Sequence, residues 1–125
     1  MPTASEPWGD GPPELGPLVV CLCGSTRYKE AFEAANRAET LAGRIVLTVG
    51  FFGKREATQP SEEVKRALDE LHLQKVEMAD EILVLDVDGY IGESTSHEIA
   101  HARLMGKRVR YLSLEEQPRK SKEGA

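Results

Sequence analysis

The chain has 125 residues, 40% of them hydrophobic and 30% charged, which is typical of one globular domain. Its formal net charge of −5 argues against nucleic-acid binding, because proteins hold phosphate backbones with clustered lysine and arginine side chains. No run approaches the roughly 18 apolar residues of a membrane-spanning helix, and the start does not resemble a signal peptide. We therefore expect a cytoplasmic protein with a small-molecule partner and no membrane partner.

Both ends of the chain have compositions that disfavour a packed core. Residues 1–16 are rich in proline and glycine, and the last residues combine a proline with mixed charges. We predict a disordered leader over 1–16, one domain over 17–113 and a flexible tail over 114–125.

Short apolar runs alternate with longer amphipathic stretches between these ends. In chain order they predict a strand at 18–23, a helix at 28–42, a strand at 45–49, a helix at 61–80, a strand at 81–87, a helix at 95–105 and a strand at 109–112. Strands that alternate with helices form a parallel sheet with right-handed crossovers. We expect an α/β fold, a three-layer flavodoxin-like or Rossmann-like domain with four core parallel strands in the order 2-1-3-4.

The first predicted strand holds the two cysteines of the chain, Cys21 and Cys23. Two residues apart on a strand, their side chains point the same way, which is a poor geometry for a disulfide. We predict buried free thiols, because free cysteine is among the residues most often buried.

The loop after the first strand combines features that suit an anion. Gly24, Ser25 and Arg27 offer backbone N–H groups, a hydroxyl and a guanidinium at the start of a helix. A cation in the first turn of a helix opposes the helix dipole, so Arg27 needs another reason to be there. Ordinary N-capping by the Gly-Ser turn is the alternative. We predict that these three residues bind substrate.

The loop after the third strand lies where parallel sheets bind ligands, beyond the carboxyl ends of the strands. Its mixture of carboxylates, hydroxyls, glycines and a tyrosine is more typical of a site than of packing alone. The candidates in this loop are Asp86, Asp88, Tyr90, Gly92, Ser94 and Thr95. The alternative is a solvated turn in which Ser94 or Thr95 caps the next helix.

Glu98 is the strongest catalytic candidate. A helical-wheel count places it beside Ala102 and Met105, on the flank of the buried side of the third helix. A carboxylate there is desolvated, and it is nucleophilic if its neighbours keep it ionised. Alternatively, Glu98 completes a capping box by reaching back to the backbone at Thr95.

The segment from His97 to His101 also spells the H-E-x-x-H zinc pattern. With only three fixed positions the pattern often arises by chance, and no further histidine follows it to supply a third ligand. The wheel places both histidines toward solvent. We therefore expect no metal and no cofactor.

The second predicted helix contributes one further candidate. Its apolar stripe is formed by Val64, Leu68 and Leu71, with Lys75 inside the stripe and His72 on its margin. We expect Lys75 to extend its ammonium group to water. His72 is a weaker candidate for substrate binding than the loop residues.

Three segments resemble the nucleoside 2-deoxyribosyltransferase superfamily, which includes the 2'-deoxynucleoside 5'-phosphate N-hydrolases and small members from actinobacteria and phages. The segments are Val20–Arg27, Lys75–Asp86 and Gly89–Val109. The resemblance implies that Glu98 attacks C1' of the sugar to form a glycosyl-enzyme ester. Water resolves this ester in hydrolases, and a second base resolves it in transferases.

The resemblance also implies how the substrate is held. Gly24, Ser25 and Arg27 would bind the sugar or its 5'-phosphate, with Ser94 and Thr95 across the pocket. Better-known members have an aspartate eight residues before the aspartate of an Ala-Asp pair. At the matching position, eight residues before Asp80, this chain has His72. The acid that protonates the leaving base therefore stays open among three candidates, Asp86, Asp88 and His72.

From these residues we expect an N-glycosidase that acts on a 2'-deoxynucleoside 5'-monophosphate. A nucleoside 2-deoxyribosyltransferase and a non-catalytic nucleotide-binding sensor domain are the alternatives, and a zinc hydrolase is less favoured. The expected partner is a small-molecule nucleotide or nucleoside. A homodimer or higher homo-oligomer is expected as well, because the resemblance implies a pocket completed across a dimer interface.

Overall fold

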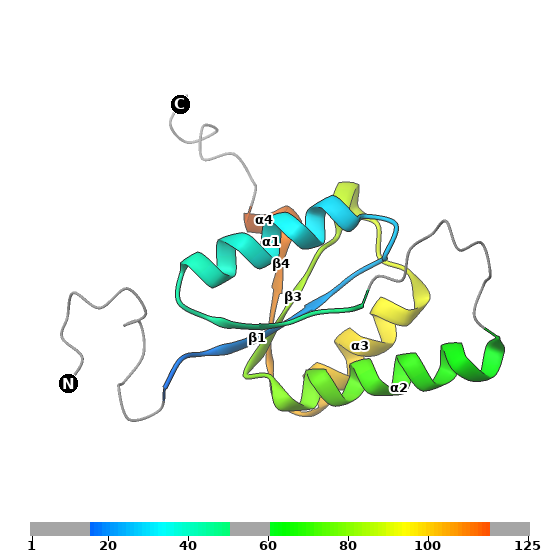
Figure 1. Ribbon diagram of the computed structural model, residues 1–125. Coiled ribbons are helices and arrows are strands. Elements are labelled where there is room, and N and C mark those ends of the chain that lie inside the picture. Colours follow the sequence, from blue (N-terminus) through cyan, green and yellow to red (C-terminus); the bar gives the residue numbers. More distant parts are fainter. Residues whose placement is uncertain (1–15, 51–60, 116–125) are drawn as a thin grey trace.

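The computed structural model describes residues 16–50 and 61–115, so the predicted leader and tail lie almost wholly outside the described residues (Figure 1). The elements are β1 (Val19–Cys23), α1 (Lys29–Leu41), β2 (Ile45–Leu47), α2 (Glu62–Met78), β3 (Glu81–Val84), the 3-10 turn η2 (Val87–Gly89), α3 (Glu93–Leu104), β4 (Arg108–Tyr111) and α4 (Leu112–Glu115). All four strands are parallel in the order β2-β1-β3-β4, which confirms the predicted topology. Among the described helices, none has the length and apolar character needed to cross a bilayer.

Helices cover both faces of the sheet, with α1 on one side and α2 and α3 on the other (Figure 1). Successive side chains of a strand point to opposite faces, so β1 and β3 each contribute to two cores. The core on the α1 side is formed by Val20, Leu22, Phe32, Ala35, Leu83 and Leu85. The core on the other side is formed by Cys21, Cys23, Val76, Ala79, Ile82, Val84 and Ala102. Burial on both faces explains why β1 and residues 82–84 of β3 are continuously apolar.

The predicted boundary signals of the first two helices are present in the structure. The Ser61 hydroxyl accepts a hydrogen bond from the Val64 amide at 3.1 Å and caps the start of α2. After α1, Gly43 adopts a φ of 89°, the left-handed conformation that ends many helices.

The elements around the third strand differ from the prediction. The strand ends at Val84 rather than 87, because the backbone turns into η2, where Asp88 has a φ of 54°. Helix α3 begins at Glu93 with Gly92 at its N-cap, so Ser94 and Thr95 lie inside the first turn and do not cap the helix. The predicted start of α3 at residue 95 is therefore wrong by two residues.

The end of the sheet carries a short helix that the sequence pattern did not indicate. Helix α4 follows β4 directly and spans the predicted domain boundary at 113. Asp86 holds it in place, because its carboxylate accepts from the Ser113 amide at 2.9 Å and from the Ser113 hydroxyl at 2.7 Å.

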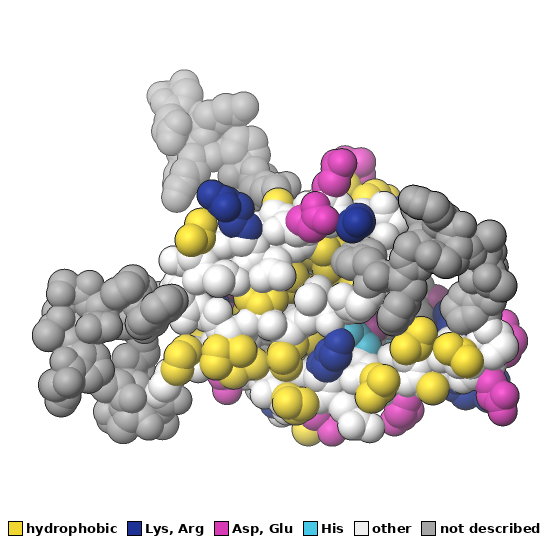
Figure 2. Space-filling model, in the orientation of Figure 1, with side chains coloured by type: hydrophobic (Ala, Val, Ile, Leu, Met, Phe, Trp, Pro, Cys, Tyr) yellow, Lys and Arg dark blue, Asp and Glu magenta, His cyan; other side chains and the backbone are white. Residues whose placement is uncertain are grey.

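The predicted buried face of α2 is wrong. Val64 and Leu71 are exposed, whereas His72 and Val76 are buried. The N-terminal half of α2 extends past the sheet, and Figure 2 shows hydrophobic side chains at the surface along this helix. Lys75 is half-buried, and its ammonium group donates a hydrogen bond to the Thr48 carbonyl at 2.6 Å instead of projecting freely into water as expected. Only the C-terminal half of α2 therefore packs against the strands.

Candidate functional site

Four buried side chains meet between β1 and the helices α2 and α3. The His72 Nε2 atom lies 3.7 Å from the Cys21 Sγ, 3.6 Å from the Cys23 Sγ and 3.9 Å from the Glu98 Oε1. We call Cys21, Cys23, His72 and Glu98 the buried cluster.

The fold explains why residues so far apart in sequence meet here. Cys21 and Cys23 occupy alternate positions of β1, so both face the α2 and α3 side. Glu98 lies one turn before the fully buried Ala102, on the face of α3 that packs inward. Cys23 is the last residue of β1, so the buried cluster extends to the carboxyl edge of the sheet.

Two polar atoms of the buried cluster have no hydrogen-bond partner among the described residues, His72 Nδ1 and Glu98 Oε1. A buried unpartnered polar atom costs about 1–3 kcal/mol, so such atoms are rare in native proteins and tend to mark functional sites. Thr95 lies inside α3 rather than at its cap, so the capping-box alternative for Glu98 loses its geometric basis.

The surroundings of the cluster shift the pKa values of its members. Burial raises the pKa of Glu98 to about 7, although the charge of His72 opposes this shift. Burial lowers the pKa of His72, but the hydrogen bond and charge of Cys21 and the charge of Glu98 outweigh it, so the net shift is upward. With pKa values shifted in this way, Glu98 and His72 can exchange a proton instead of holding fixed charges.

The two thiols shift in opposite directions. The hydrogen bond from the Cys23 thiol, helped by His72, lowers the pKa of Cys21 to about 6 against the opposing effect of burial. The same hydrogen bond and burial hold the pKa of Cys23 well above its usual value. Both cysteines are free and buried, as predicted.

A small cleft connects the cluster to the surface. Its volume is about 50 Å³, and its lining residues are Asp69, Leu73, Ser94, His97 and Glu98. Ligand pockets usually measure about 300–1,000 Å³, so this cleft admits only part of a nucleotide. Glu98 is the member of the buried cluster that a ligand in the cleft would meet.

The two loops predicted to form the site meet beside this edge. The Arg27 guanidinium lies 4.7 Å from the centre of the Tyr90 ring and 5.8 Å from that of Tyr28, and the two rings contact edge to face. These are cation–π contacts, which hold Arg27 at the surface without neutralising its charge. No ion pair of Arg27 occurs within the described segments.

The glycines and serine of these loops have local structural roles. A Cβ atom on Gly24 would lie 3.2 Å from the Leu85 carbonyl, so glycine permits β1 to turn closely against β3. A Cβ atom on Gly92 would lie 3.0 Å from the Tyr90 hydroxyl. The Ser25 hydroxyl accepts from the Arg27 amide at 3.3 Å, which stabilises the turn that presents Arg27.

The remaining predicted residues lie outside the buried cluster. Both Asp86 oxygens accept hydrogen bonds from Ser113, and Asp88 is exposed on η2. Thr95 is buried in the first turn of α3, and Ser94 is exposed and lines the cleft. The two loops predicted to bind substrate therefore lie beside Glu98, and the sequence pattern did not predict which ionisable groups meet Glu98.

The histidine pair of the zinc pattern does not form a metal site with a third ligand in the described part of the chain. His101 Nε2 lies 2.8 Å from Glu77 Oε2, and His97 is exposed. Within residues 16–50 and 61–115, the ligand atoms that gather within 4.8 Å of one another belong to Cys21, Cys23 and His72. The sequence feature that could have indicated this group of ligand atoms is the pair of cysteines on one face of β1.

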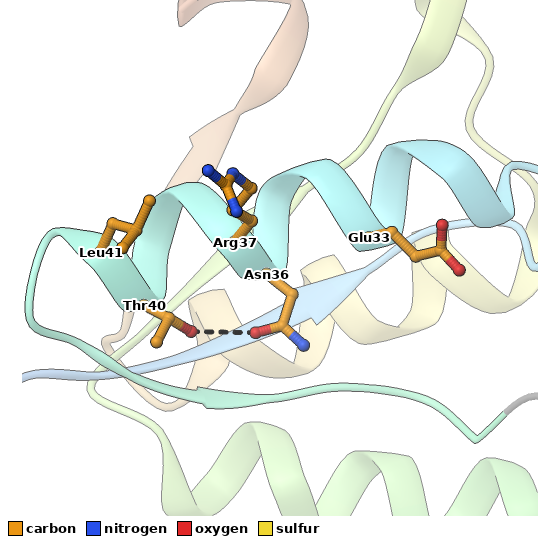
Figure 3. Close-up of a pocket in the computed structure, with 5 residues that line it drawn as sticks. All are labelled: Glu33, Asn36, Arg37, Thr40 and Leu41. Atoms are coloured by element: carbon orange, nitrogen blue, oxygen red, sulfur yellow. Dashed lines mark hydrogen bonds between the residues drawn. The ribbon is translucent and has the colours of Figure 1, made fainter.

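A larger hollow of about 420 Å³ lies on the outer face of α1 (Figure 3). Its lining residues are Glu33, Asn36, Arg37, Thr40 and Leu41, all from this one helix. The Thr40 hydroxyl donates to Asn36 at 3.0 Å, and all five residues are exposed. It is an open surface without a buried ionisable group, so the smaller cleft beside Glu98 is the better candidate site.

Comparisons with known proteins do not add to this geometry. A scan against protein-family models, a search of curated proteins and a search of solved structures each return no match for the chain.

Proposed function

We propose that this chain cleaves the base–sugar bond of a 2'-deoxynucleoside 5'-monophosphate, with Glu98 as the nucleophile. The observation that carries the proposal is the Glu98 carboxylate, which is buried, has an unpartnered oxygen and borders a cleft. A poorly solvated carboxylate is a strong nucleophile once ionised, because little water must be displaced before it attacks. The resemblance to the nucleoside 2-deoxyribosyltransferase superfamily supports the same role.

The proposed reaction has two steps. A Glu98 carboxylate oxygen attacks C1', the bond from C1' to the base nitrogen breaks, and the electron pair leaves with the base. The base takes a proton from His72, and the sugar remains as an ester of Glu98. Water then attacks C1' of this ester and returns a proton to His72, which releases deoxyribose 5-phosphate and restores the Glu98 carboxylate.

His72 is the favoured acid among the three that the sequence left open. Its Nε2 lies 3.9 Å from Glu98 Oε1, whereas both oxygens of Asp86 are already occupied by Ser113. Asp88 is exposed on η2 and outside the buried cluster. His72 is therefore the nearest of the three to Glu98, although it does not line the cleft, so the role requires that bound substrate bring the base within hydrogen-bond reach of His72.

The loop after β1 supports a phosphorylated substrate. The cleft admits only part of a nucleotide, so the 5'-phosphate must be bound outside it. Arg27 offers an exposed guanidinium that contacts aromatic rings and, within residues 16–50 and 61–115, forms no ion pair with a carboxylate, so it is available to a dianion there. Ser25 stabilises the turn from which Arg27 projects.

The test is incubation with each of the four deoxynucleoside 5'-monophosphates, and with the matching nucleosides, followed by chromatography for free base. We expect free base and deoxyribose 5-phosphate from at least one monophosphate, and slower release from its nucleoside. Exchange of an added labelled base without net hydrolysis would identify a transferase. Ligand binding without base release would identify a sensor domain and contradict the proposal.

We also propose that a second copy of the chain is a partner. Hydrophobic side chains stay exposed on β2 and α2, among them Ile45, Leu71 and Met78. Exposed apolar patches on soluble domains commonly mark protein interfaces. Light scattering across a concentration series should give a dimer mass, and a monomer at every concentration would contradict this expectation.

A further inference from the structure

The buried cluster contains more chemistry than a glycosidase needs. Cleavage of a glycosidic bond calls for a nucleophile and an acid, yet two thiols lie beside Glu98 and His72. Cys21, Cys23 and His72 are each buried, and their Sγ and Nε2 atoms lie within 4.8 Å of one another. Thiolate sulfur and imidazole nitrogen are the ligands that zinc prefers in proteins.

The separations between these atoms match a tetrahedral zinc site. Zn–S bonds of about 2.3 Å and Zn–N bonds of about 2.0–2.1 Å at a tetrahedral angle place sulfur about 3.6 Å from nitrogen. The two measured separations, from His72 Nε2 to the thiols of Cys21 and Cys23, are 3.7 Å and 3.6 Å. The imidazole nitrogen therefore lies at the separation from each sulfur that a shared zinc ion requires.

A fourth ligand is adjacent. Glu98 Oε1 has no hydrogen-bond partner in the described segments and lies 3.9 Å from His72 Nε2. In a tetrahedral site a carboxylate oxygen lies about 3.3 Å from the imidazole nitrogen, so a shift of about 0.6 Å closes the coordination shell. The cleft bordered by Glu98 gives a cation a route to the cluster.

We propose that Cys21, Cys23 and His72 bind one zinc ion. Glu98 completes the site as the fourth ligand. Two soft sulfur donors select zinc over magnesium and calcium, which prefer oxygen ligands. This site is distinct from the H-E-x-x-H pattern, in which His97 and His101 would be the ligands, because neither of those histidines belongs to the buried cluster.

The test is cobalt titration of the reduced, chelator-treated full chain without oxygen or substrate. Tetrahedral Co²⁺ bound by thiolates gives an intense near-ultraviolet charge-transfer band and strong visible bands, and octahedral Co²⁺ with oxygen ligands gives neither. We expect one Co²⁺ per chain with the thiolate band, displaced by one equivalent of Zn²⁺. The intensity of the band counts the thiolates, so the wild-type protein alone tests the two cysteines.

Variants then assign the ligands. Cys21→Ser and Cys23→Ser should each roughly halve the charge-transfer band and weaken zinc binding more than about 100-fold, since loss of an outer-shell contact alone costs about 10- to 100-fold. His97→Ala and His101→Ala are the matched controls and should keep zinc affinity within about threefold, because neither histidine is a ligand. Circular dichroism confirms that each variant is folded.

Three results would overturn the proposal: no binding at millimolar zinc, a cobalt spectrum without the thiolate band, or affinity lost in the two histidine controls but kept in the cysteine variants. All of these measurements are made without nucleotide. Failure of the metal site therefore leaves the proposed glycosidase untouched, and absence of base release leaves the metal site untouched.

Discussion

Two ionic clusters lie on opposite sides of the sheet, and they differ in how their charges are paired. On the α1 side, the Arg110 guanidinium donates to Glu39, Glu81 and Glu115 at 2.7–3.0 Å. We call these four residues the arginine cluster. On the α2 and α3 side, the buried cluster contains two polar atoms without a hydrogen-bond partner among the described residues.

This difference in charge pairing indicates a structural role for the arginine cluster and a chemical role for the buried cluster. In the arginine cluster the charge-assisted hydrogen bonds offset the cost of removing Glu39 and Glu81 from water. In the buried cluster that cost is not offset for Glu98, whose Oε1 has no hydrogen-bond partner among the described residues, so Glu98 reduces stability rather than increases it. Proteins retain such groups where a ligand or a reaction uses them.

The largest expected effect is that of Glu98→Gln on turnover. Glutamine has nearly the same shape but cannot form the proposed ester, so base release should fall by at least about a thousandfold, or about 4 kcal/mol of barrier. The unfolding free energy should stay the same or increase, because a buried ionisable group is removed. Both are measured, by base release and by urea unfolding.

The matched control for this variant is Glu93→Gln, an exposed carboxylate in the first turn of the same helix. It should leave turnover within about twofold, since it lies outside the buried cluster. Turnover of Glu98→Gln within about tenfold of wild type, roughly 1.4 kcal/mol, would remove Glu98 from the role of nucleophile.

The arginine cluster should behave in the opposite way. Arg110→Ala removes the closest counter-charge of the buried Glu39 and Glu81 and leaves them longer contacts to Arg44 at 3.4 Å and Arg108 at 3.5 Å, so the unfolding free energy should fall by up to about 3–5 kcal/mol. Urea unfolding measures the change. Arg108→Ala is the control, because this exposed arginine reaches Glu81 only at 3.5 Å and should cost less than about 1 kcal/mol. Equal losses from the two variants would refute the structural role of the arginine cluster.

The comparison extends to Arg27, which has no carboxylate partner in the part of the chain that the structure describes. Arg27→Ala should lower kcat/KM for the monophosphate by about 10- to 100-fold, or about 1.4–2.7 kcal/mol, while hardly changing that for the free nucleoside. Arg37→Ala, in the hollow on α1, is the control and should change neither value. Equal losses on both substrates would make Arg27 a structural residue rather than a phosphate ligand.

The smallest expected effect concerns pH. Hydrogen bonds from Arg110 lower the pKa of Glu115 below its ordinary value of 4.5. The folded state therefore favours the carboxylate, and the resulting stability is present above pH 4.5 and lost as the pH falls further. Glu115 is partly exposed, so the effect should stay below about 1 kcal/mol.

The measurement compares the unfolding free energies of wild type and Glu115→Gln at two pH values. The two proteins should differ at pH 7 and converge toward pH 3. A difference that persists at low pH would show that the hydrogen bonds to Arg110 act independently of the charge on Glu115.

The sequence predicted the sheet because the pattern of each strand is local. Continuous apolar runs in β1 and β3 follow from burial on both faces, and signals such as Ser61 and Gly43 mark helix ends without reference to the rest of the chain. The burial of Glu98 was also predictable, because Glu98 lies one turn before the buried Ala102 in the same helix.

The partners of Glu98 could not be predicted in this way. The stripe of Val64 and Leu71 suggested the wrong buried face for α2, because periodicity does not reveal how far a helix extends past the sheet. The contact between His72 and Cys21 joins residues 51 positions apart, and it depends on where α2 lies over β1. Helix α4 was missed because it depends on Asp86, which lies 27 positions before its partner Ser113.

The single unpartnered oxygen of Glu98 has a thermodynamic consequence for the two proposals together. As nucleophile this oxygen would contact the nucleotide, and as fourth ligand it would contact zinc. The nucleotide and zinc would therefore exclude each other. Binding free energies are reciprocal, so a nucleotide that weakens zinc binding by some factor must itself be weakened by zinc by that same factor. Once free zinc exceeds its dissociation constant, the apparent KM for the nucleotide would rise in proportion to the zinc concentration. A metabolite and a metal would then compete for the same site.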